Sequence, residues 1–241
     1  MKRTLSIVAL AAGILAMGSV QAAPGTDSAF NFRMGGFFPS GNGDFWEANE
    51  AAFTLDHSDF DGFTAGASYV AGLNNYIEFG LGADFYYEDV RSADRNFVDQ
   101  PFGNPILHDT RLSMIPMYVD LKFLPAGRYK RTGADGRRFV RRPVPYIGGG
   151  IGMTYWEYEE EGDFVASDLS IVYDRLKASD LAFEKHVMAG IEFPVSPQWY
   201  ITLEARQSWV EDTPGGAFAV INPGELDLGG TSVFVGGSLR F

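Results

Sequence analysis

Apolar and polar residues alternate along most of this chain. In the stretch 75–90, Ile77, Phe79 and Leu81 fall on one side, whereas Glu78 and Asp84 fall on the other. Successive side chains of a strand point to opposite faces, so this period of two predicts a β-strand. The pattern also occurs in residues 30–38, 61–71, 112–123, 144–158, 180–193, 198–209 and 231–241, so the sequence predicts eight strands.

The predicted strands are long, and the connections between them alternate in length. Long polar segments occupy 39–60, 91–108, 159–178 and 211–229, whereas short turns occupy 72–75 and 194–198. Strands of about 10 residues or more joined alternately by long loops and short turns are typical of transmembrane barrels. The predicted fold class is therefore all-β, a transmembrane eight-stranded antiparallel up-and-down β-barrel. A soluble exported sandwich is the alternative fold, but its strands usually have only about five or six residues.

The ends and the composition of the chain define its compartment. Residues 1–22 carry Lys2 and Arg3, an apolar run and a small-residue site, which predicts a signal peptide cleaved after Ala22. Residues 23–241 then form one domain, the outer-membrane β-barrel domain.

The chain has no cysteine and a net charge of −12. The acidic balance argues against nucleic acid as a partner, because phosphates need a basic surface. The sequence indicates no cofactor.

Aromatic residues mark the ends of several predicted strands. Trp199 and Trp209 bracket the strand 198–209, as the two interfacial girdles of a membrane barrel require. Tyr146 at one end and Tyr155, Trp156 and Tyr158 at the other are expected to do the same for the strand 144–158. The centre of that strand, "YIGGGIG", has so few side chains that its facing stays open, and glycines there let a small barrel curve.

The exported start, the eight strands, "PYIGGGIG" and the final "GGSLRF" together resemble the small outer-membrane β-barrel proteins of OmpA transmembrane-domain and OmpX type. The resemblance implies a Gram-negative outer membrane, a monomer, and contact with outer-membrane lipid and lipopolysaccharide. It also implies that a C-terminal aromatic residue serves as the assembly signal read by the barrel-assembly machinery. Phe241 matches that position.

The polar strand faces predict a charged lumen. An eight-stranded barrel is just wide enough for side chains to fill, so charges inside must pair. One hypothesis is a packed ion-pair network that fixes the barrel. The other is a gate for a small channel, which would prefer cations because acids outnumber bases. The predicted lumen residues are Arg33, Glu78, Asp84, Glu88, Asp120, Lys122, Glu184, His186, Glu192, Glu204, Arg206 and Arg240.

The connection 125–143 is longer and more basic than the other turns at its end of the barrel. It predicts a periplasmic hairpin that attracts anionic lipid headgroups, with a periplasmic partner as the alternative. Its basic residues are Arg128, Lys130, Arg131, Arg137, Arg138, Arg141 and Arg142.

Little in the sequence indicates catalysis or a metal. His57 and Ser58 lie between Asp56 and Asp59, but triad partners usually come from different elements. The run "EYEEEGD" at 157–163 lacks EF-hand spacing and is expected to be a solvated loop, with a weak divalent-cation role at the lipopolysaccharide surface as the alternative. No catalytic residue and no metal site are therefore predicted. The predicted function is structural or surface-interactive, with a small cation-preferring channel as the alternative and a lipid A-modifying enzyme as a weaker one.

Overall fold

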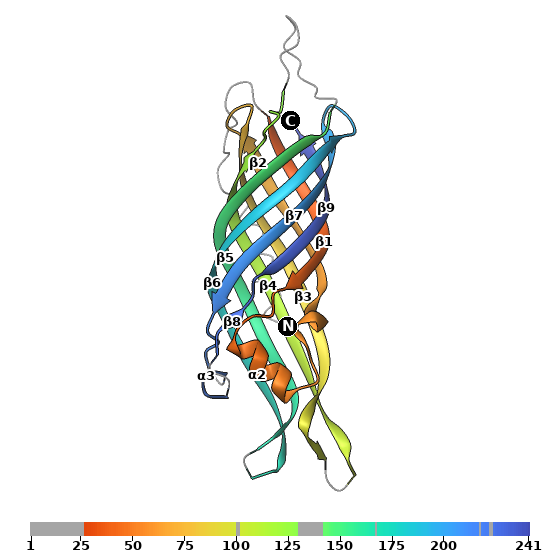
Figure 1. Ribbon diagram of the computed structural model, residues 1–241, viewed down its shortest axis with the longest axis vertical. Helices are drawn as coiled ribbons and strands as arrows, with labels where there is room; N and C mark the ends of the chain where they lie inside the picture. The colour runs from red at the N-terminus through yellow and green to blue at the C-terminus, as the bar shows by residue number, and fades with distance from the viewer. Residues whose placement is uncertain (1–26, 100–101, 130–141, 167, 217, 222–223) are drawn as a thin grey trace, which may run out of the picture.

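The computed structural model describes residues 27–99, 102–129, 142–166, 168–216, 218–221 and 224–241. Eight strands form a closed ring in which every neighbouring pair is antiparallel. β1 pairs with both β2 and β9 and thereby closes the ring. The predicted fold class is confirmed (Figure 1). The ring consists of β1 (Ser28–Pro39), β2 (Gly62–Gly72), β3 (Ile77–Asp99), β4 (Asn104–Phe123), β5 (Val144–Val165), β6 (Ile171–Pro194), β7 (Trp199–Asp212) and β9 (Gly230–Arg240).

The two ends of the barrel differ. One end carries the short turns and the C-terminus, and we call it the turn end (Figure 1). The other, the loop end, carries the helix α2 (Asp44–Ala52), the 3-10 helix η1 (His57–Phe60), the short helix α3 (Phe218–Ile221) and the two-residue strand β8 (Leu226–Asp227), which pairs with β7 outside the ring. No helix in the described residues is long and apolar enough to span a membrane.

An apolar outward face surrounds the ring. Large apolar side chains such as Phe32, Leu121 and Ile151 point outward and are exposed. Toward the loop end this band ends at Tyr87 on β3 and Tyr155 on β5, and the next outward residues are acidic. Trp199 and Trp209 also point outward, as predicted. The band therefore defines the part of the barrel that lipid surrounds, and the strands beyond it lie in water.

Two of the four predicted loops are mostly strand. The segments predicted as loops at 91–108 and 159–178 instead form the outer parts of the β3–β4 and β5–β6 hairpins (Figure 1). Beyond the lipid, neither face of a strand has to be apolar, so the alternation that identifies a strand disappears there. The predicted ends of these strands were wrong because the alternation of apolar and polar residues stops at the edge of the lipid, whereas the backbone hydrogen bonds between the strands continue beyond it.

Inward-facing glycines make room for long side chains in this narrow ring. A Cβ at Gly66 would lie 1.8 Å from Oδ1 of Asp84, and a Cβ at Gly150 would lie 2.7 Å from Nε2 of His186. Gly148, Gly150 and Gly152 thus face the interior, next to bulky side chains of β4 and β6. The structure thus shows which residues of the "YIGGGIG" stretch face the interior, a question that the sequence pattern leaves open.

Candidate functional site

Four side chains form a closed ionic cluster in the middle of the lumen, which we call the central quartet: Arg33, Asp84, Glu204 and Arg206. Arg33 contacts Asp84 at 2.7 Å and Glu204 at 3.1 Å. Arg206 contacts the same two carboxylates, each at 3.1 Å. The four residues come from β1, β3 and β7, so the cluster links strands that are far apart in sequence.

Further groups complete the coordination of the central quartet. Lys122 lies 3.6 Å from Oε2 of Glu204, and the Tyr146 hydroxyl donates a hydrogen bond to the same oxygen at 2.7 Å. The ring of Tyr118 lies under the guanidinium groups of both arginines, 5.3 Å from Arg33 and 4.4 Å from Arg206. A buried charge is stable only when it is paired and hydrogen-bonded, and this cluster meets that condition.

A second cluster, the turn-end quartet, closes the lumen near the short turns. It comprises Glu78, Arg128, Glu192 and Arg240. Arg128 contacts Glu78 at 2.7 Å and Glu192 at 2.5 Å, and Arg240 contacts both acids at 3.1 Å. All four side chains are at most 3% exposed, and the ring of Tyr200 lies beside both guanidinium groups.

The position of Arg128 corrects the prediction for the basic hairpin. Gly127 has a φ of 68°, which lets the chain turn back after Leu124 and carry Arg128 under the lumen. There Arg128 pairs with two carboxylates that Arg240 alone could not neutralise. It is therefore an interior residue and not part of a headgroup-facing surface. Arg142 is half-buried and donates to backbone carbonyls of the same turn. Lys130, Arg131, Arg137, Arg138 and Arg141 lie outside the described residues.

The other predicted lumen residues are less tightly paired. Glu184 contacts Nδ1 of His186 at 3.1 Å and accepts a hydrogen bond from Thr154 at 2.6 Å. Asp120 is buried, and no ion pair to it is present in the described chain. Glu88 is only half-buried near the loop end and likewise has no ion pair there. The structure thus places eleven of the twelve predicted residues inside or against the packed network, with Glu88 at its edge.

With Arg128 included, the interior is almost balanced in charge. Between the turn end and the cap, the buried acids of the lumen are Glu78, Asp84, Asp120, Glu184, Glu192 and Glu204, and the buried bases other than histidine are Arg33, Lys122, Arg128, Arg206 and Arg240. The predicted excess of acids therefore amounts to a single charge.

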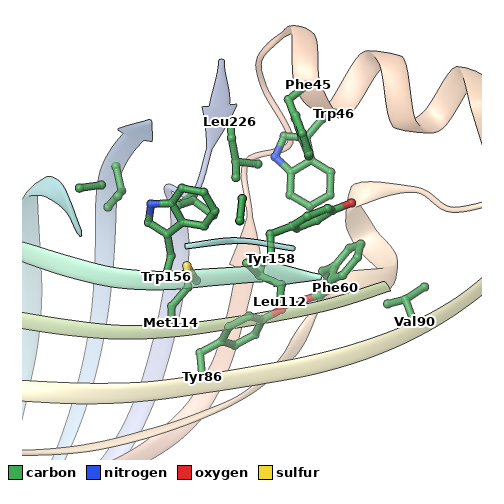
Figure 2. Packing of buried hydrophobic residues seen from close by; sticks show 14 of the residues in the cluster. Phe45, Trp46, Phe60, Tyr86, Val90, Leu112, Met114, Trp156, Tyr158 and Leu226 are labelled. Carbon is green, nitrogen blue, oxygen red and sulfur yellow. Dashed lines mark hydrogen bonds between the residues drawn. The ribbon is translucent and has the colours of Figure 1, made fainter. Parts of the chain in front are cut away.

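A compact apolar cap fills the barrel mouth at the loop end. Phe45 and Trp46 of α2 are fully buried and belong to one apolar cluster with Tyr158 and Trp156 of β5 and Leu226 of β8 (Figure 2). The ring of Phe45 lies 5.1 Å from that of Tyr158, and the ring of Trp46 lies 5.2 Å from that of Phe60. Trp156 and Tyr158 therefore point into the mouth, and Tyr146 is buried in the lumen, whereas the sequence predicts all three in an interfacial girdle.

Hydrogen bonds fix the cap to the barrel wall. Nε1 of Trp46 donates to the carbonyl of Asp227 at 2.8 Å. Asn49 donates to the Tyr158 hydroxyl at 3.0 Å, and that hydroxyl donates to Glu160 at 2.9 Å. α2 starts after Gly43, with Asp44 and Glu47 in its first turn, where acids favour the positive end of the helix dipole.

Little free space remains between the cap and the central quartet. A cavity of about 30 Å³ has Asp84, Glu184 and Arg206 on one side and Met114 and Leu228 on the other. This volume holds about two water molecules. The lumen is therefore closed in layers, by the turn-end quartet, the central quartet and the cap.

Outside the lipid band, the β3–β6 hairpins carry a surface network of ion pairs. Arg111 contacts Asp89 at 3.0 Å, Glu159 at 2.8 Å and Glu161 at 2.9 Å. These hydrogen bonds hold the pKa of Arg111 above its usual value. The predicted solvated loop at 157–163 is thus a strand, and both Glu159 and Glu160 in it are buried. Beside the network, a hollow of about 310 Å³ opens on the outward wall.

His57 does not meet Ser58 in a catalytic arrangement. Its Nδ1 lies 3.0 Å from Oε1 of Glu50 and 3.4 Å from Oδ1 of Asp56. Ser58 donates its backbone N–H to Asp56, which caps η1. The side chains of Glu50, Asp56 and His57 are the one group of metal-ligand type within 4.8 Å of one another in the described chain. They form a partly exposed hydrogen-bonded cluster that links α2 to η1.

A closed ring of strands with an apolar outward face and a polar, ion-paired interior defines a transmembrane β-barrel. Residues 8–241 match the model of the outer membrane protein beta-barrel domain. The chain therefore belongs to this family and resides in the bacterial outer membrane. The predicted resemblance to small outer-membrane barrels is confirmed. The loop end is accordingly extracellular and the turn end periplasmic.

Solved structures of other outer-membrane proteins are similar to this chain. OprG of Pseudomonas aeruginosa is 12% identical, with a TM-score of 0.52 over 90% of this chain and 97% of that chain. A major outer membrane protein from Thermus thermophilus is 11% identical, with a TM-score of 0.46 over 89% and 99% of the two chains. The N-terminal barrel domain of Pseudomonas aeruginosa OprF is also 11% identical, with a TM-score of 0.40 over 89% and 97%. No curated protein sequence matches the chain.

The cap is the main part of the site that the sequence pattern missed, although a signal for it exists. Phe45, Trp46, Asn49 and Phe53 recur at helical spacing within a segment taken as a polar loop. The aromatic residues beside the interior charges could also have been found, because residues such as Tyr118 occupy the inward-facing positions of their strands. No comparable sequence signal predicts that Arg128 reaches into the lumen, because a turn residue does not follow the inward and outward alternation of a strand.

Proposed function

We propose that this protein is a closed outer-membrane barrel that acts through its extracellular surface and not by conduction. The observation that carries this proposal is the double closure of the lumen, by ion-paired quartets and by an apolar cap. We therefore expect each layer by itself to interrupt a water path through the lumen. Meanwhile, β3 to β6 extend far beyond the lipid band and present a broad surface to the outside (Figure 1).

Lipopolysaccharide of the same membrane is the partner that this surface meets first. The hollow on the outward wall lies just beyond the lipid band and is lined by Arg91, Arg111, Asp109, Glu161 and Tyr173 among others. Arginine and tyrosine side chains bind phosphates and sugar hydroxyls, and carboxylates bind the divalent cations that bridge phosphates. Arg91 is the available cation, because its side chain is 69% exposed and its contact with Asp109 is long, at 3.8 Å.

Two measurements test the proposal. Purified native barrels in planar bilayers should pass no current at neutral pH, and steady cation-selective current would support the channel alternative instead.

The amount of lipopolysaccharide that copurifies with the barrel should be lower in the variant Arg91→Glu than in the native chain. The matched control is Arg142→Glu at the periplasmic end, which should leave the amount unchanged. Equal losses in both variants would contradict a specific role for the hollow.

The lipid A-modifying alternative has weaker support. In the described chain, His57 contacts carboxylates, and His108 is sealed between the rings of Phe53 and Phe164 at 4.5 and 4.7 Å. Neither histidine has a hydrogen bond to a hydroxyl nucleophile. Lipid A of cells that express the native chain should therefore have an unchanged mass.

A further inference from the structure

Glu160 is a buried acid at the interface between the cap and the barrel wall. The residue is 3% exposed and lies on the inner face of β5, beyond the lipid band. Its carboxylate accepts a hydrogen bond from the Tyr158 hydroxyl at 2.9 Å, and no ion pair to it exists in the described chain. This sets it apart from the lumen acids of the two quartets, each of which contacts two arginines.

The residues that face Glu160 offer no positive charge. Thr110 of β4 and Leu176 of β6 lie directly opposite it on the neighbouring strands. His108 is the diagonal neighbour on β4, and burial lowers the pKa of its imidazole, so that it is neutral at pH 7. Tyr158 is the other titratable neighbour, and burial raises the pKa of its hydroxyl well above the usual value.

Charged groups of the surrounding elements are directed elsewhere. Arg111 of β4 and Arg175 of β6 bind Glu159 on the outer face of the sheet. The charged residues of α2 are acids, and Glu50 among them pairs with His57. Asp227 of β8 accepts from Ser40, while Phe218 of α3 contributes only a ring against Tyr158. An ionised Glu160 is therefore uncompensated.

We propose that Glu160 is a pH-sensitive latch for the cap, holding α2 in the barrel mouth when protonated and loosening it when ionised. The link is the hydrogen-bond chain from Asn49 of α2 through the Tyr158 hydroxyl to Glu160. This inference goes beyond the proposed function, because it concerns how the cap is held. It stands whether or not the barrel binds lipopolysaccharide.

The direction of the pH dependence follows from the two states. With the cap docked, burial raises the pKa of Glu160 to about 7 from an ordinary value of 4.5. With the cap released, the carboxyl meets water and its pKa returns toward the ordinary value. The docked state thus binds the proton more tightly, so docking is strongest below about pH 4.5 and weakens up to about pH 7. The full change in the docking equilibrium is roughly 300-fold, since each pKa unit is a factor of ten.

A distance measurement between the cap and the wall tests the latch directly. The native chain has no cysteine, so spin labels can be attached at Ala51→Cys on α2 and Ser179→Cys on β6, both exposed positions. The distance between the two spin labels is recorded in detergent at about pH 5 and about pH 8, on either side of the raised pKa of Glu160. We expect one narrow distance at the acidic value and a broader, longer population at the alkaline one. If the docked form dominates at both values, urea is added, and the midpoint for loss of the narrow distance must be lower at the alkaline value.

Two further variants identify the group responsible. Glu160→Gln cannot ionise, so the labelled variant should keep the narrow distance, or an unchanged urea midpoint, across the same pH range. Glu161→Gln changes the adjacent residue on the opposite face of β5 and should respond to pH like the native chain. A native chain with no pH response would overturn the proposal, and so would a response that persists in Glu160→Gln.

Discussion

At the scale of single residues, the interior charges of this barrel depend on one another. Each quartet has two arginines that both contact the same two carboxylates. Removing one member therefore leaves the others partly unpaired in a narrow interior that is shielded from bulk water. Surface pairs such as Arg91 and Asp109 lack this dependence, because water solvates whichever partner remains.

Arg128 provides the sharpest residue-scale test. Arg128→Met keeps much of the side-chain length but leaves Glu78 and Glu192 with Arg240 alone. We expect the free energy of unfolding to fall by about 3–5 kcal/mol, the usual cost of breaking a buried pair. Urea unfolding in detergent, followed by tryptophan fluorescence, measures it. The control Arg91→Met should cost at most about 1 kcal/mol. Similar losses in the two variants would show that the turn-end quartet is not a coupled unit.

At the scale of elements, inward-facing glycines make room for the long charged side chains of the neighbouring strand. In Gly66→Ala, the new methyl would overlap the carboxylate of Asp84 and approach the carbonyl of Ala83 at 2.6 Å. Stability should fall by about 1–3 kcal/mol, the usual cost of overpacking. Gly237→Ala is the control, because nothing lies within 4 Å of its added Cβ. Urea midpoints in detergent compare them, and equal midpoints would refute the packing argument.

The closing strand β9 supplies a second test at the same scale. Phe241 exchanges backbone hydrogen bonds with Ser28 of β1, and its ring lies 5.9 Å from that of Phe30. We propose that Phe241 is the assembly signal, so Phe241→Ala should reduce insertion in cells but leave refolding in detergent nearly unchanged. Phe30→Ala removes a neighbouring lipid-facing ring and should insert normally. Heat-modifiable migration of membrane fractions distinguishes inserted barrels, and normal insertion of Phe241→Ala would count against the signal.

At the scale of the whole molecule, closure has two layers, and the layers should act independently. Replacing Phe45 and Trp46 by serine removes the core of the cap. Replacing one acid and one arginine of each quartet (Asp84→Asn and Arg206→Gln, Glu78→Gln and Arg240→Gln) disrupts the ionic layer. We expect no current from either variant in planar bilayers and measurable current only when the cap changes and the quartet changes are combined. Current from the cap variant alone would show that the quartets do not close the lumen.

The sequence by itself determined the strands inside the lipid, the phase of all of them except the glycine-rich strand 144–158, and the side on which the charges of those strands lie. Lipid on one face and a narrow interior on the other impose a strict period of two, so Ile77 and Glu78 could be assigned to opposite faces from letters alone. Outside the lipid that constraint ends, and the extension of β3 to Asp99 and β6 from Ile171 left no pattern to recognise.

Only the tertiary structure decided which charges meet and what fills the mouth. Arg128 comes from a turn, and its pairing with Glu78 and Glu192 depends on how the chain folds back beneath the ring. Likewise, α2 has helical spacing in the sequence, but that spacing does not say whether it packs on the barrel or stays in water. Local patterns record the environment of a residue, whereas partners distant in sequence are brought together only when the ring closes.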